Sequence, residues 1–102
     1  MNSQASDRLK IMDTTDLSEE SLERILKRLR RIEGQVRGLQ KMIEAGRPCE
    51  EVLTQMSATK KAMEAASNTI LRDFLTLCAS DIARGDTKKP EQIALLLRKF
   101  AS

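Results

Sequence analysis

Residues 22–43, LERILKRLRRIEGQVRGLQKMI, decide the fold. Their apolar residues recur at alternating spacings of three and four: Leu22, Ile25, Leu29, Ile32, Val36, Leu39 and Ile43. This seven-residue repeat over three heptads is typical of a helix that packs one side against other helices. Ser18 and the two acidic residues after it suit a helix start, and Gly46 suits a helix end. The sequence therefore predicts one helix from about residue 18 to 45.

A second and longer helix is predicted after Pro48, because residues 49–84 contain neither Gly nor Pro. Its apolar positions keep a helical spacing: Val52, Leu53, Met56, Met63, Ala66, Ile70, Phe74 and Leu77. A helix of about 35 residues is about 50 Å long, which is more than the first helix can cover. Its apolar face therefore predicts an oligomer. Gly85 should end this helix.

Pro90 should open a short third helix, with Ile93, Leu96, Leu97 and Phe100 on one side. Residues 1–17 are polar and lack periodicity, so they are expected to form a disordered tail, and residues 18–102 to form the single domain. The predicted fold class is all-α, with a three-helix protomer.

Composition excludes several classes of function. The chain of 102 residues has two Phe, no Trp, no Tyr and no His. Scarce aromatic side chains argue against an RNA-binding or single-strand-binding surface, which stacks bases on aromatic rings. No acid–base pair, histidine or phosphate loop suggests an enzyme, and no cofactor is expected. An apolar leader and an apolar run of 18 residues are both missing, so the protein is expected in the cytoplasm, without a membrane partner.

The two cysteines, Cys49 and Cys78, are the candidate sensing residues. Cys49 follows Pro48 in the first turn of the long helix, where the helix dipole and Arg47 favour a thiolate, while Glu50 and Glu51 oppose it. Twenty-nine residues of helix span roughly 43 Å, whereas a disulfide needs Cα atoms within about 7 Å. At about 100° per residue both thiols lie on one face. An antiparallel second copy would place Cys49 beside its Cys78, twice per dimer.

Two other interpretations of the cysteines remain open. Both could be small buried hydrophobic residues, as free cysteines often are. Two thiolates could also hold Cu(I), which accepts soft sulfur ligands, although they could not alone complete a zinc site.

Seven basic residues and one acid, Glu33, lie between residues 24 and 41. The basic face comprises Arg24, Lys27, Arg28, Arg30, Arg31, Arg37 and Lys41, all off the apolar stripe, and Lys60 and Lys61 add charge on the second helix. A solvated helix face would explain the charges, but the scarcity of acids favours double-stranded DNA as a partner. Without a helix-turn-helix, binding is expected through phosphates and groove shape.

Residues 28–64 carry motifs that resemble the CsoR/RcnR family of bacterial repressors. These motifs are RIEGQVRG at 31–38, Cys49 after a short loop, and QMSA at 55–58. The resemblance implies an antiparallel dimer of three-helix protomers, a tetramer of two dimers, and repression of a nearby detoxification operon. It also makes Arg28 the strongest candidate for a DNA contact, because Arg28 matches a basic position that the family uses. Arg31, Lys41, Lys60 and Lys61 are weaker candidates.

The ligand positions indicate a branch of this family. Its copper sensors use Cys, His and Cys, and these positions fall on Cys49, Phe74 and Cys78. Phenylalanine cannot ligate copper. The nickel and cobalt members use several histidines, and the formaldehyde-responsive members use an N-terminal Pro and a His, and this chain lacks these residues. The remaining branch that the chain resembles is CstR, which keeps both cysteines and senses persulfides and polysulfides. Phe74 departs from the polar residue that this branch has at the same position. The apolar ring should make the surroundings of the cysteines drier.

The sequence thus predicts a homotetrameric operator-binding repressor of a sulfide detoxification operon. The inducer would be a persulfide or polysulfide, taken up by Cys49 and resolved by Cys78 of the partner protomer, with no metal bound. One alternative is a Cu(I)-responsive repressor with an altered site. Another is a helical thiol carrier or scaffold that does not bind DNA, which the basic face argues against.

Overall fold

In the computed structural model, residues 13–100 are described and form a 3₁₀ turn and three α-helices. The elements are η1 (Thr14–Asp16), α2 (Glu19–Glu44), α3 (Cys49–Ala83) and α4 (Lys89–Phe100). The all-α prediction is confirmed, and each helix begins and ends within one or two residues of its expected position. Within the described range, every helix is too short or too polar to cross a bilayer.

The same motif ends both long helices. Gly46 has φ of 68° and Gly85 has φ of 101°, values that cost glycine little but other residues much. After α2, the N–H of Arg47 donates to the Met42 carbonyl at 3.0 Å, and that of Gly46 to the Ile43 carbonyl at 3.1 Å. This pair of bonds is the Schellman motif, which satisfies carbonyls that a helix end leaves open. The predicted glycine caps are therefore confirmed.

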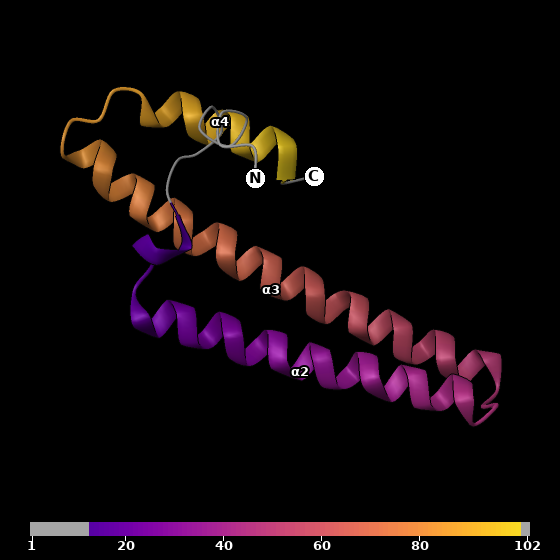
Figure 1. Ribbon diagram of the computed structural model, residues 1–102. Helices are drawn as coiled ribbons and strands as arrows, with labels where there is room; N and C mark the ends of the chain where they lie inside the picture. The colour runs from indigo at the N-terminus through magenta and orange to yellow at the C-terminus, as the bar shows by residue number, and fades with distance from the viewer. Residues whose placement is uncertain (1–12, 101–102) are drawn as a thin grey trace, which may run out of the picture. The chain divides into compact units, whose positions relative to one another are not determined.

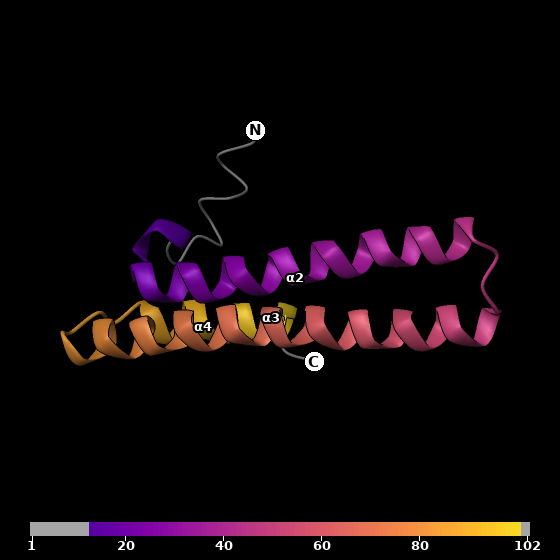
Figure 2. The same ribbon diagram turned by 90° about the horizontal axis from the view of Figure 1, so that it is seen from below.

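Residues 19–71 form one compact unit, in which the first part of α3 runs antiparallel beside α2 (Figure 1, Figure 2). Ile25, Ile32 and Leu39 of α2 are buried at a spacing of seven residues. The facing side of α3 is small and polar, and it comprises Val52, Gln55, Thr59, Ala62, Ala66 and Thr69. Thr59 and Thr69 donate to carbonyls four residues earlier, so their hydroxyls are satisfied in this interface.

The expected core of this unit differs from the observed one. Leu29, Val36 and Ile43, which belong to the predicted stripe, are exposed, as are Leu53, Met56 and Met63 of α3. The heptad pattern is therefore divided between two surfaces, one buried within the chain and one exposed on it. Large apolar side chains on a water-facing helix surface indicate a protein partner.

The second unit holds residues 13–18 together with residues 72–100. The chain reverses after Gly85, and α4 runs back past the last turns of α3 (Figure 1). Ile93, Leu96 and Leu97 are half-buried as predicted, but Phe100 is exposed. The predicted tail also differs from the structure at its end, because η1 is ordered and Leu17 is buried. Residues 1–12 of that tail lie outside the described part of the chain.

Candidate functional site: two thiols and a basic helix face

Cys49 is the first residue of α3, and its side chain is exposed. The preceding turn ends at Pro48, whose carbonyl accepts the N–H groups of Glu51 and Val52 at 3.0 and 3.2 Å. Arg47 does not act as a free cation beside the thiol, contrary to the expectation from sequence. Its guanidinium donates to the Glu51 carboxylate, with N–O distances of 2.8 and 2.9 Å. Cys49 is thus open to a reagent from solvent.

Cys78 lies in the other unit and is fully buried, with 0% of its surface exposed. Burial raises the pKa of its thiol, the Lys89 ammonium opposes this rise, and Asp81 and Asp86 add to it. Burial therefore disfavours the thiolate form of Cys78. The two cysteines therefore differ in their access to solvent, one of the properties on which thiol reactivity depends.

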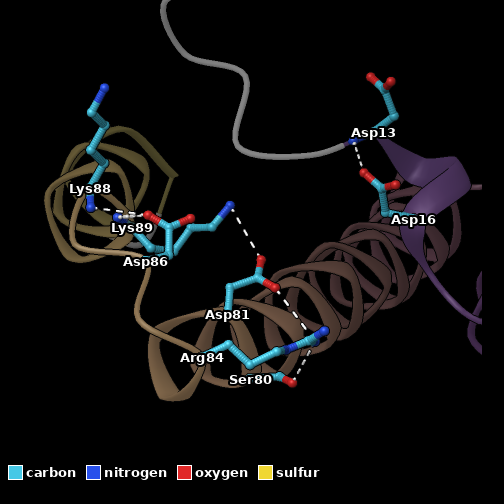
Figure 3. A network of polar contacts seen from close by, with 8 residues as sticks. All are labelled: Asp13, Asp16, Ser80, Asp81, Arg84, Asp86, Lys88 and Lys89. Atoms are coloured by element: carbon cyan, nitrogen blue, oxygen red, sulfur yellow. Dashed lines mark hydrogen bonds and ion pairs between the residues drawn. The ribbon is translucent and has the colours of Figure 1, made fainter.

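Charged side chains at the junction of α3 and α4 surround the turn that follows Cys78 (Figure 3). The buried Lys89 ammonium lies 3.4 Å from the Asp81 carboxylate, which also lies 3.7 Å from the Arg84 guanidinium. Asp86 accepts the backbone N–H groups of Lys88 and Lys89 at 3.0 and 3.1 Å, and so satisfies donors at the start of α4. This network fixes α4 beside the Cys78 end of α3.

Phe74 lies one turn before Cys78 on α3 and is half-buried. Residues four apart share a helix face, so Phe74 and Cys78 lie on the same side of α3. Among residues 13–100, no three His, Cys, Asp or Glu side chains are grouped closely enough to hold one metal ion.

All five predicted DNA contacts are exposed on long helices: Arg28, Arg31 and Lys41 on α2, and Lys60 and Lys61 on α3. Arg28 and Arg31 line the same hollow of about 140 Å³, together with Ile32, Gln35 and Ala62. Neither arginine makes a hydrogen bond or ion pair with any described residue. Arg37, by contrast, lies 3.4 Å from Glu33. The structure thus brings two cations without a described partner together at one place on the basic face.

Sequence reasoning did not single out Gln35, the third polar residue of this hollow. Its Oε1 atom is buried and accepts no hydrogen bond from the described residues. The only signal in the sequence was its place inside the RIEGQVRG motif, seven residues after Arg28, which puts the two side chains on nearly the same side of α2.

Comparison with known proteins shows the family of the chain. A family model described as metal-sensitive transcriptional repressor matches residues 21–99. The copper-sensing transcriptional repressor CsoR of Bacillus subtilis (strain 168) is 43% identical over 85 residues, which cover 81% of this chain and 84% of that protein. RicR, a copper-sensing repressor of Mycobacterium tuberculosis, is 42% identical over 81 residues, covering 74% of this chain and 84% of RicR.

A solved structure of similar fold is the copper-sensing repressor CsoR with Cu(I) from Geobacillus thermodenitrificans NG80-2. Its TM-score is 0.70 at 37% identity, covering 83% of this chain and 91% of that one. The matched proteins are regulators of transcription rather than enzymes. The matched region includes both cysteines and all five basic candidates. The chain therefore belongs to the family of metal-sensitive transcriptional repressors, and its resemblance to CsoR/RcnR repressors is confirmed.

Proposed function

We propose that this repressor binds operator DNA in the cytoplasm and is released by persulfides or polysulfides, through Cys49 of one protomer and Cys78 of its partner. The observation that carries the proposal is that the chain has one exposed thiol, one fully buried thiol and no histidine. The copper sensors of the family that this chain resembles use a histidine between two cysteines as a third ligand, and this chain has Phe74 at that position. Thiol chemistry needs only the two cysteines.

The chemistry runs in two steps. The Cys49 thiolate attacks the outer sulfur of a persulfide donor, and the donor leaves as a thiolate, so that Cys49 carries a persulfide. The Cys78 thiol of the partner then gives up its proton, and its sulfur attacks the inner sulfur of that persulfide. The S–S bond breaks and hydrosulfide leaves, so the two thiols are oxidised to a disulfide while the transferred sulfur is reduced. Exposure of Cys49 and burial of Cys78 support this order of attack.

The link must join two protomers, because α3 is helical from Cys49 to Ala83. The 29 residue steps from Cys49 to Cys78 correspond to roughly 43 Å of helix, far beyond the reach of a disulfide. For induction, the intersubunit bridge must stabilise the conformation with low affinity for DNA more than it stabilises the DNA-bound conformation.

The protein is expected to be a tetramer at micromolar concentration. The exposed apolar residues of the first unit provide surfaces for a second copy: Leu26, Leu29, Val36, Ile43, Leu53, Met56 and Met63. Light scattering coupled to gel filtration should give about four times the chain mass of 11.5 kDa. A species of 11.5 kDa under these conditions would contradict both the assembly and the intersubunit thiol pair.

Arg28→Ala is expected to lower operator affinity about tenfold without changing helicity or assembly. Arg28 is exposed and has no partner among the described residues, so its charge is available to a phosphate. Removing one protein–phosphate ion pair should also reduce the slope of log affinity against log salt by about 0.9. Arg37→Ala is the matched control, because Arg37 is already paired with Glu33. Fluorescence anisotropy over a salt series measures both quantities, and equal behaviour of the two variants would place the DNA surface elsewhere.

The second candidate inducer is Cu(I), which is favoured by the copper-sensing relatives. We expect stoichiometric Cu(I) under anaerobic conditions, with competing thiols present, to leave the repressor on its operator. Release of the operator under those conditions would replace the sulfur proposal with a copper sensor that has an altered site. A helical thiol carrier, the remaining alternative, would show no gel shift with upstream DNA in any state.

A further inference from the structure

The hollow between α2 and the first part of α3 combines charge, a buried polar atom and space. Arg28, Arg31 and Gln35 lie within two turns of α2, and the small side chain of Ala62 faces them from α3. Its volume of about 140 Å³ gives room for several water molecules. A small polar ligand therefore fits without displacing either helix.

The two arginines supply donors only. Each guanidinium has five N–H donors, no acceptor and a permanent positive charge. Within the described chain, neither Arg28 nor Arg31 is bonded to a carboxylate or carbonyl. Planar guanidiniums of this kind bind carboxylate and phosphate oxygens through charge-assisted hydrogen bonds. The hollow is therefore suited to an anion.

Gln35 adds a hydrogen-bond acceptor, so a ligand in the hollow must also carry a donor. Its Oε1 atom is shielded from water and receives no hydrogen bond from the described residues. Buried acceptors are nearly always satisfied in folded proteins, so this oxygen indicates a missing donor. Gln35 lines the same hollow as the two arginines, so an anion held by the guanidiniums lies beside this amide.

Few small anions offer both acceptor oxygens for the arginines and a hydrogen-bond donor for Gln35. Inorganic phosphate near neutral pH has several acceptor oxygens and still carries a proton on at least one oxygen. A phosphate monoester, whose second pKa is about 6, has mostly given up that proton, and a DNA phosphodiester and sulfate have none. We propose that Arg28, Arg31 and Gln35 form an oxyanion site for inorganic phosphate, with Gln35 accepting a hydrogen bond from its P–OH group.

Such a site would regulate DNA binding. This consequence rests on the proposed function, in which Arg28 and Arg31 contact the operator. A free phosphate that occupies both guanidiniums withdraws them from the DNA backbone, so phosphate weakens operator binding beyond its effect on ionic strength. The effect is independent of the thiols, and it persists in a Cys49→Ser variant.

The site is tested on the assembled protein without DNA. Inorganic phosphate and sulfate are titrated separately at constant ionic strength, and binding is followed by calorimetry and by the side-chain amide resonances of Gln35. Phosphate should bind more tightly than sulfate by about tenfold, the effect of one hydrogen bond to a charged group. Gln35→Leu should abolish this preference and leave sulfate binding unchanged, whereas Arg28→Ala should weaken both anions.

Gln40→Leu is the matched control, because Gln40 is an exposed glutamine of the same helix and lies outside the hollow. Equal affinities for phosphate and sulfate in the unaltered protein, or equal behaviour of the two glutamine variants, would overturn the site. Competition with the operator is measured separately by anisotropy. Phosphate that binds as described but leaves the operator bound would overturn the placing of DNA on Arg28 and Arg31, and not the oxyanion site.

Discussion

Cys49→Ser is expected to abolish the release of operator DNA by polysulfide while leaving operator affinity without polysulfide unchanged. Cys49 is the exposed thiol, and a serine hydroxyl is not ionised at neutral pH and does not attack sulfane sulfur. The unaltered protein should form a covalent dimer on non-reducing gels after polysulfide treatment, and the variant should not. Anisotropy with the operator, before and after treatment, measures the loss directly.

Cys78→Ser is the matched variant for this experiment. Because Cys49 remains, the variant should still gain mass in steps of about one sulfur atom, as expected for persulfide formation. It should not form the Cys49–Cys78 link, which peptide mapping identifies in the unaltered protein. A link confined to one chain would contradict the mechanism. So would a Cys78→Ser variant that forms the same dimer and releases DNA normally.

The helices could be predicted closely because their signals are local. Gly46 and Gly85 end two helices through backbone angles that other residues avoid, and the heptad repeat marks residues 22–43 as one amphipathic helix. The core could not be predicted so well. A repeat shows that Ile32 and Val36 are apolar, but it does not show which of them faces α3. The structure resolves this, because only the small residues of α3, such as Ala66, allow it to pack closely against α2.

The candidate site likewise combines features that the sequence reveals with features that depend on packing. Residue type and spacing made Cys49 and Cys78 candidates, and the family resemblance made Arg28 one; all three remain predictions. The burial of Cys78 depends on α4 and the turn before it, where Lys89 pairs with Asp81, and no pattern within α3 reveals that contact. Gln35 was missed for a related reason, since an unsatisfied amide oxygen is a property of packing and not of sequence.

Phe74→His is expected to convert this chain toward a copper sensor. Phe74 is half-buried one turn before Cys78 and on the same face of α3, at the position where the copper-sensing members of the family that it resembles carry histidine. The substitution adds an imidazole to two thiolates, and all three ligands suit Cu(I). Changes to outer-shell partners alone alter metal affinity by about 10- to 100-fold, so a direct ligand should raise Cu(I) affinity by about a hundredfold.

The gain in affinity is measured by competition with a chromophoric Cu(I) chelator under anaerobic conditions, and release of the operator is followed in parallel. Thr76→His is the matched control, because Thr76 is exposed on the same helix, and two residues of helix turn it about 160° away from Phe74. Circular dichroism checks that each variant stays helical. If Phe74→His binds Cu(I) no more tightly than Thr76→His does, the Cys49–Cys78 pair of two protomers does not converge at Phe74. The intersubunit arrangement proposed for sulfur sensing would then be wrong as well, since both chemistries need the partner's Cys49 at that place.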